Sequence, residues 1–291
     1  ARTSRYRRES SLDEKYDPPP AVSIAWSTPG SVLFAATGLI EGGFPGSVTL
    51  VCEEATLPYH RPPLSKQYLT AGEDSPPTRL RPAQAYADHG IELKLGAPAT
   101  AIDRPLRRIH IDGAEPVEYD TLILATGAQA RPLELPLPDG PLAPGVLHTL
   151  RTLDDARRLR NALRAGSAVA IVGGGYIANE FAGIFHQFGA HVTLINRSDQ
   201  ILRGYDESVR DRLLQISLAK GMEFRFNANF EKIVKQEDGS LVVHMSNHEP
   251  IEVDLVLFAT GRVPRTADIG LETVGLEPGS WLEVDDSLRV T

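Results

Sequence analysis

The chain of 291 residues has only one cysteine, Cys52. A single cysteine excludes every intrachain disulfide, whether structural or redox-active, and we expect a reducing, cytoplasmic location. No apolar run is long enough to span a membrane, and no basic start leads into the apolar segment of a secretory signal. We therefore expect no membrane partner, and no cluster of residues predicts a metal site.

Excess positive charge is also missing. Asp and Glu number 38 against 30 Lys and Arg, so the formal net charge is −8. This balance argues against a nucleic-acid partner. The 42% hydrophobic and 23% charged content is ordinary for a globular protein, and the length is sufficient for two domains with their own cores.

The strongest motif follows an apolar run at residues 168–172, which predicts a buried strand. Gly173, Gly175 and Ala178 come next in the spacing G-x-G-x-x-A, and Tyr176 and Ile177 begin a helical pattern. A second strand is expected at residues 191–195. Such a unit predicts a dinucleotide site, because glycines let a pyrophosphate reach backbone N–H groups at the helix start. A purely structural tight turn is the alternative.

The same unit indicates which dinucleotide is bound. An NAD site usually places an acid at the end of the second strand to hold the ribose hydroxyls. Asn196 occupies that position, and Arg197 and Arg203 follow it. Arginine suits a 2′-phosphate because its planar fork donates two hydrogen bonds and keeps its charge. We therefore predict NADPH rather than NADH, with two solvated surface arginines as the alternative.

A similar unit precedes it, with strands expected at residues 21–26 and 47–52 and a helix at residues 32–40. Its fingerprint is degenerate, because Ser27, Pro29 and Val32 stand at the three fingerprint positions and none of them is glycine. Pro29 also has no N–H group to offer a phosphate. Gly30 and the helix start could still favour an anion. Glu53 follows the second strand, where a ribose-binding acid belongs, although a solvated acid fits the pattern equally well.

The two halves repeat one plan. Each has a strand–helix–strand unit, a short antiparallel meander and a buried strand that ends in Ala-Thr-Gly; the first of these buried strands is expected at residues 121–125. We predict an α/β fold with two Rossmann-like, three-layer (ββα) dinucleotide-binding domains. The expected divisions are a disordered tail (1–20), a first nucleotide domain (21–145), an NADPH domain (146–265) and the start of a return to the first domain (266–291).

Several stretches carry a family resemblance. LPYHRPPLSK, TAID and LATGAQARPL resemble ferredoxin-reductase-type flavoproteins, whereas GGGYIANEFAG, INRSDQILRGYDE and FATGRVPRT closely resemble bacterial glutathione reductase. The chain thus resembles the pyridine nucleotide–disulfide oxidoreductase superfamily over about residues 21–291. The chain stops before the Gly-Asp motif that completes the flavin site in this superfamily, so we expect a C-terminally truncated form.

The resemblance implies roles for individual residues. It assigns FAD to the first half and NADPH to the second, with Lys66 and Glu180 paired beside the flavin as catalytic residues. Tyr176 would gate the nicotinamide pocket. The residues implied to contact the cofactors are Gly30, Glu53, Ala99, Thr100, Ala101, Thr126, Gly127, Gly173, Gly175, Tyr176, Ile177, Ala178, Arg197, Arg203, Gly261 and Arg262.

The implied activity is an FAD-dependent NADPH oxidoreductase, in which hydride passes to the flavin and electrons pass on to an acceptor. The acceptor is expected to be an iron–sulfur protein or a small molecule, because the cysteine pair of glutathione reductase is absent. A disulfide reductase fragment without its redox cysteines and a non-catalytic nucleotide-binding fragment are the alternatives. A homodimer is expected only of a full-length form.

Overall fold

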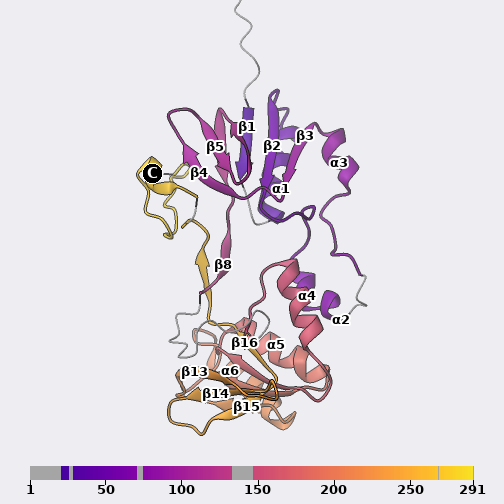
Figure 1. The fold of residues 1–291 in the computed structure, drawn as a ribbon, viewed down its shortest axis with the longest axis vertical. Helices are drawn as coiled ribbons and strands as arrows, with labels where there is room; N and C mark the ends of the chain where they lie inside the picture. The colour runs from indigo at the N-terminus through magenta and orange to yellow at the C-terminus, as the bar shows by residue number, and fades with distance from the viewer. Residues whose placement is uncertain (1–20, 26–28, 71–74, 133–146, 268, 291) are drawn as a thin grey trace, which may run out of the picture.

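The computed structural model describes residues 21–25, 29–70, 75–132, 147–267 and 269–290. The predicted disordered tail, residues 1–20, lies outside this range. Two α/β lobes lie at opposite ends of an elongated molecule (Figure 1). Within the described residues, no helix combines the length and the apolar character needed to cross a bilayer.

The first lobe is built on a parallel sheet with the strand order β3-β2-β1-β7. The same lobe contains a second, antiparallel sheet with the strand order β4-β5-β6. Helix α1 connects β1 to β2, and a short helix α3 precedes β3. The bounds are β1 Ala21–Ala25, α1 Pro29–Glu41, β2 Ser47–Cys52, α3 Ala83–Asp88, β3 Ile91–Leu95, β4 Ala99–Asp103, β5 Arg108–Ile111, β6 Ala114–Glu118 and β7 Thr121–Leu124.

The second lobe repeats this plan around a parallel sheet with the order β12-β11-β10-β16-β9. One side of this sheet packs against helix α5, and the other packs against the meander β13-β14-β15. The bounds are β9 Leu147–His148, α4 Leu153–Ala162, β10 Ala168–Val172, α5 Tyr176–Gln187, β11 His191–Ile195, α6 Glu207–Ala219, β12 Glu223–Arg225, β13 Phe230–Lys235, β14 Leu241–Met245, β15 Ile251–Val253 and β16 Leu255–Phe258.

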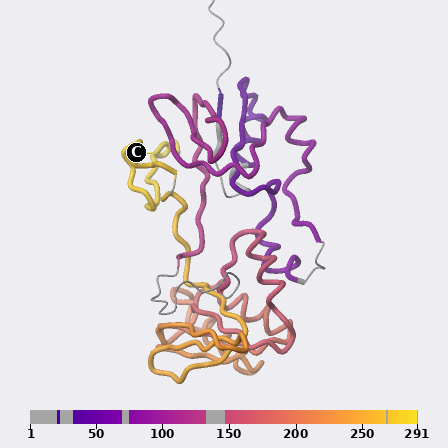
Figure 2. The backbone as a smooth tube through the Cα atoms, viewed as in Figure 1, coloured from indigo at the N-terminus to yellow at the C-terminus, as the bar shows by residue number. Residues whose placement is uncertain are grey.

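The lobes are connected at two places (Figure 1). Strands β8 (Ala128–Ala130) and β17 (Arg262–Pro264) pair antiparallel as a two-stranded ribbon. On the other side, the chain runs down from the first lobe into the short helices η1 (Pro62–Ser65) and α2 (Gln67–Thr70), which pack on α4 (Figure 2). Buried Tyr59, Leu64 and Tyr68 meet Leu153 and Ala156 of α4 there. A segment from the first half of the sequence therefore forms part of the surface of the second lobe.

The predicted fold class is confirmed, with two local corrections. Helix α1 begins at Pro29, three residues before the predicted start. Proline favours the first helical position, because the N–H group that it lacks has no partner inside the helix anyway. The strand predicted to be buried at residues 121–125 is half-exposed and ends at Leu124, because β7 is an edge strand of the described sheet.

Candidate functional site

The turn after β10 requires its first glycine. Gly173 has φ +135°, and a Cβ added there would lie 2.5 Å from the backbone oxygen of Ala259 on the neighbouring strand end. The Gly173 N–H donates to the oxygen of Ile195 at 2.9 Å, so the turn is tied to both adjoining strands. A side chain at residue 173 is therefore excluded by the fold itself.

Gly175 serves another purpose. It is the N-cap of α5, with φ −79° and ψ −177°, and a Cβ built there would meet no atom within 4 Å. The first turn of α5 holds no acidic residue. Ala178, one turn on, is fully buried beside Phe181, so the helix packs closely on the sheet. The space in front of Gly175 therefore faces the positive end of a helix dipole, which suits a phosphate.

The loop after β11 is held by Asn196, whose side chain is buried. Its Nδ2 donates to Ser198 Oγ at 3.0 Å and to the Gln200 oxygen at 2.8 Å. The N–H of Leu202 donates to the Gly174 oxygen at 2.7 Å, which fastens the loop to the fingerprint turn. In the sequence, Asn196 stands out only as a residue that is not an acid. The tendency of asparagine to bond nearby backbone groups is the signal that could have revealed this second role.

Arg197 and Arg203 project from this loop into solvent. Neither forms an ion pair with any carboxylate in the part of the chain that the structure describes. Tyr176, at the start of α5, is also exposed, whereas Ile177 lines a small cavity of about 20 Å³ together with Gly261 and Arg262. The residues predicted for NADPH thus lie at the carboxyl end of the second sheet.

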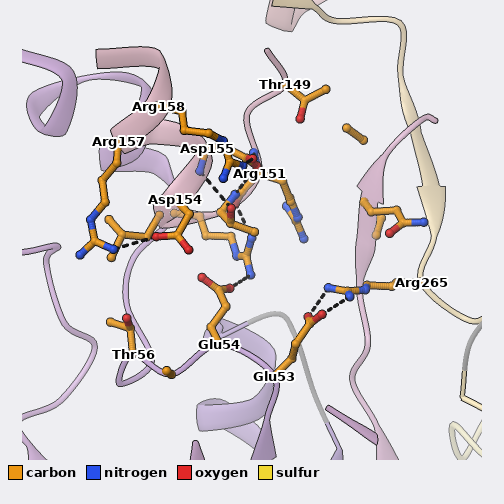
Figure 3. Close-up of a pocket in the computed structure, with 17 residues that line it drawn as sticks. Glu53, Glu54, Thr56, Thr149, Arg151, Asp154, Asp155, Arg157, Arg158 and Arg265 are labelled. Atoms are coloured by element: carbon orange, nitrogen blue, oxygen red, sulfur yellow. Dashed lines mark hydrogen bonds and ion pairs between the residues drawn. The ribbon is translucent and has the colours of Figure 1, made fainter. Parts of the chain in front are cut away.

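The acids after β2 both have basic partners (Figure 3). The two carboxylate oxygens of Glu53 accept from the two terminal nitrogens of Arg265, which follows β17. Glu54 accepts from the Tyr59 hydroxyl at 2.6 Å and from Arg61 at 2.8 Å. The alternative of a solvated acid at residue 53 is therefore wrong, because this side chain is only 28% exposed and is paired.

A cleft of about 600 Å³ opens between the lobes beside these acids. Five arginines and four acids line it: Arg61, Arg151, Arg157, Arg158, Arg265, Glu53, Glu54, Asp154 and Asp155. Four of the arginines form ion pairs with these acids. Burial, followed by the positive charges of Arg61 and Arg262, lowers the pKa of Arg151 to about 10. Arginine donors and carboxylates thus line the cleft together.

The remaining residues predicted for the first-lobe cofactor are not among those that line the cleft. Gly30 is in the first turn of α1, while the turn before it, residues 26–28, lies outside the described residues. The strand residues Ala99, Thr100 and Ala101 form the start of β4, and Gly270 packs so closely that a Cβ on it would lie 2.8 Å from Ala101 Cα. Thr126 is buried, and Gly127 after it has φ +66°.

Lys66 and Glu180 are joined in an ion pair on the second lobe, although 114 positions separate them. Ser65 Oγ also donates to the same Glu180 oxygen at 3.2 Å. The predicted approach of these two side chains is confirmed. Lys66 is 56% exposed and Glu180 37% exposed, so solvent reaches the pair, and its Coulomb energy contributes little to stability.

Comparison with known proteins places these observations in context. The family model described as pyridine nucleotide-disulphide oxidoreductase matches residues 32–291. The ferredoxin–NAD(+) reductase component of the p-cumate 2,3-dioxygenase system of Pseudomonas putida is 34% identical over 86% of this chain and 60% of its own length. The chain spans about three fifths of the length of the curated relatives it matches.

Two solved structures extend the comparison. A covalent putidaredoxin reductase–putidaredoxin complex matches with a TM-score of 0.77 and 28% identity, over 92% of this chain and 63% of the other. An engineered water-forming NADPH oxidase bound to NADPH matches with a TM-score of 0.80 over 93% of this chain and 60% of the other. Its 18% identity shows a shared fold alone.

Proposed function

This chain belongs to the pyridine nucleotide-disulphide oxidoreductase family, and we propose that it forms the cofactor-binding part of an FAD-dependent NADPH oxidoreductase that delivers electrons to an iron–sulfur protein. FAD, when bound, would take up hydride from NADPH and release electrons to the acceptor. The residues of this chain would bind both cofactors and set their relative orientation.

The observation that carries the choice of NADPH is the charge at the end of β11. A 2′-phosphate brings two negative charges to the place where an NAD site usually keeps an acid. Asn196 removes the repulsion such an acid would cause, and the exposed guanidinium groups of Arg197 and Arg203 are available as donors. The relative from Pseudomonas putida is named for NAD(+), so this preference would distinguish the present chain from that protein.

The engineered oxidase offers a chemical parallel. It is described as carrying five substitutions: a glycine to alanine, an aspartate to alanine eighteen positions later, arginine and serine at the next two positions, and arginine seven positions after the aspartate. This chain has Ala178, then a residue without charge at 196, then Arg197, Ser198 and Arg203 at the same spacing. The parallel concerns residue types and spacing alone.

The proposal for FAD rests on the cleft between the lobes. The arginines that line it would donate to the diphosphate of a dinucleotide in exchange for the acids of the cleft, and Glu53 lies at the strand end where a ribose would be held. The Lys66–Glu180 pair lies on the second lobe, and we assign it to the reacting face of the flavin. A lysine there would stabilise negative charge on a reduced ring, and Glu180 would hold the ammonium group in position.

The proposed acceptor is a one-electron iron–sulfur protein. Putidaredoxin in the matched complex and the ferredoxin named for the Pseudomonas relative support this choice. A dithiol acceptor built into the chain is excluded, because Cys52 is the only cysteine. Burial, followed by the charge of Glu54, raises the pKa of Cys52 to about 12, so its thiol stays protonated and unreactive.

Arginine replacement tests the nucleotide assignment. Arg197→Ala and Arg203→Ala should each weaken NADPH binding by about tenfold to a hundredfold, as expected for the loss of one charge-assisted contact. The affinity for NADH should stay within about twofold of the wild-type value, since it has no 2′-phosphate. Arg212→Ala, an exposed arginine on α6, is the matched control. Equal losses for NADPH and NADH would refute the assignment.

A further inference from the structure

Arg265 contacts two of the residues assigned to FAD. Its terminal nitrogens donate to both carboxylate oxygens of Glu53, 212 positions earlier in the chain. Its backbone N–H donates to the oxygen of Gly127 at 3.0 Å. Figure 3 shows its side chain reaching across from the ribbon of β8 and β17 toward the end of β2. The return strand is thus fastened to the first lobe at the edge proposed for the cofactor.

The position of Glu53 makes this contact significant. Strands β1 and β2 are parallel, with Ala25 beside Val51. Glu53 therefore lies at the carboxyl end of the sheet, as does the start of α1. A dinucleotide bound at that edge would present its adenosine ribose hydroxyls to an acid in this position. Those hydroxyls would donate to the same carboxylate oxygens that Arg265 now engages. The ribose and the guanidinium therefore compete for one acceptor group.

We infer that the Arg265 side chain engages the carboxylate that the adenosine ribose would use, and that it must leave Glu53 when FAD binds. This inference rests on the proposed flavin site. It makes Arg265 a determinant of cofactor affinity, because Arg265 and the ribose compete for the Glu53 carboxylate. The backbone bond from Arg265 to Gly127 remains in place, so only the side chain has to move.

The surroundings allow that movement. The Arg265 side chain is 31% exposed and that of Glu53 is 28% exposed, so water solvates both groups once they separate. Ion pairs with such access to solvent contribute modestly to stability and weaken with added salt. The cleft of about 600 Å³ that both residues line gives the released side chain room to turn. The exchange should therefore lower FAD affinity without preventing binding.

The test uses Arg265→Asn, with Arg108→Asn as the matched control, since Arg108 forms an exposed ion pair with Glu118 on the meander at 2.7 Å. Quenching of flavin fluorescence would give the affinity for FAD and for FMN, which has a phosphate but no adenosine ribose. Arg265→Asn should bind FAD about threefold to tenfold more tightly. FMN affinity, and both affinities in the control, should stay unchanged.

Three results would overturn the inference. Weaker FAD binding by Arg265→Asn would show that Arg265 holds the cofactor, equal gains for FMN would show a general opening of the cleft, and unchanged FAD binding would show no competition. In a Glu53→Gln background, replacement of Arg265 should bring no gain. The affinity for NADPH, measured on the same samples, tests the proposed function separately, since the second lobe binds it independently of Glu53. Added salt should also bring the FAD affinities of wild type and Arg265→Asn together.

Discussion

Gly173 and Gly175 make a matched pair in the fingerprint turn, and alanine at each should give opposite results. Alanine at 175 adds one methyl group to open space and keeps an ordinary φ of −79°. The change should leave the fold intact. The methyl group would, however, stand where a pyrophosphate must approach the start of α5. Gly175→Ala should therefore lose dinucleotide affinity and keep its stability.

The magnitudes follow from the geometry. Replacing glycine by alanine at a helix N-cap costs about 0.5–1 kcal/mol of unfolding free energy at most. Losing one or two charge-assisted hydrogen bonds to phosphate would weaken NADPH binding by about tenfold to ten-thousandfold, since each contributes roughly 1.5–3 kcal/mol. Gly173→Ala instead meets a backbone oxygen at 2.5 Å and a φ of +135°, so it should destabilise the fold by several kcal/mol, on the order of 2–4.

Two measurements on each variant separate these effects. Chemical denaturation gives the unfolding free energy, and NADPH fluorescence gives the dissociation constant. Gly175→Ala should show a near-wild-type denaturation curve with a large loss of affinity, and Gly173→Ala a shifted curve. If Gly175→Ala bound NADPH within about twofold of wild type, no phosphate would pass over residue 175, and the site would have to be assigned elsewhere.

Three further predictions concern the lobe boundary and the first sheet. Tyr59→Phe should destabilise the protein by about 1–3 kcal/mol in thermal denaturation, because the buried hydroxyl also accepts from the Leu153 N–H at 2.9 Å; an unchanged melting temperature would contradict this. Cys52, with its pKa raised to about 12, should react with a thiol reagent at pH 8 only after unfolding, and rapid labelling of the native protein would disprove its burial. Glu180→Gln should slow flavin reduction by NADPH about tenfold or more with little change in NADPH affinity, because it releases Lys66; an unaltered rate would remove the pair from the reacting face.

Local patterns predicted the elements well. Apolar runs and glycine spacing gave residues 168–172 and 191–195 as strands, and the structure has both with those bounds. The start of α1 was missed because the apolar pattern begins only at Val32, although proline suits the first helical position. Strand β7 was predicted, but its partial exposure was not, because an apolar run does not reveal whether a strand lies inside a sheet or at its edge.

Contacts between distant segments were predictable only where a resemblance linked them. The Lys66–Glu180 pair was expected on that basis, and the structure brings the two side chains together. No local pattern indicates that Arg265 would engage Glu53, since the partners are 212 residues apart and meet only when the return strand packs on the first lobe. The packing of residues 59–70 on α4 was likewise missed, because it depends on how the two lobes dock.

We propose that FAD bound to this chain would accept hydride from NADPH. Its most direct test is to load the purified chain with FAD, mix it anaerobically with NADPH or NADH, and follow the loss of the visible flavin absorbance. We expect NADPH to reduce the flavin at far lower concentrations than NADH does. A protein that takes up no FAD, a flavin that neither nucleotide reduces, or reduction by NADH in preference to NADPH would contradict it.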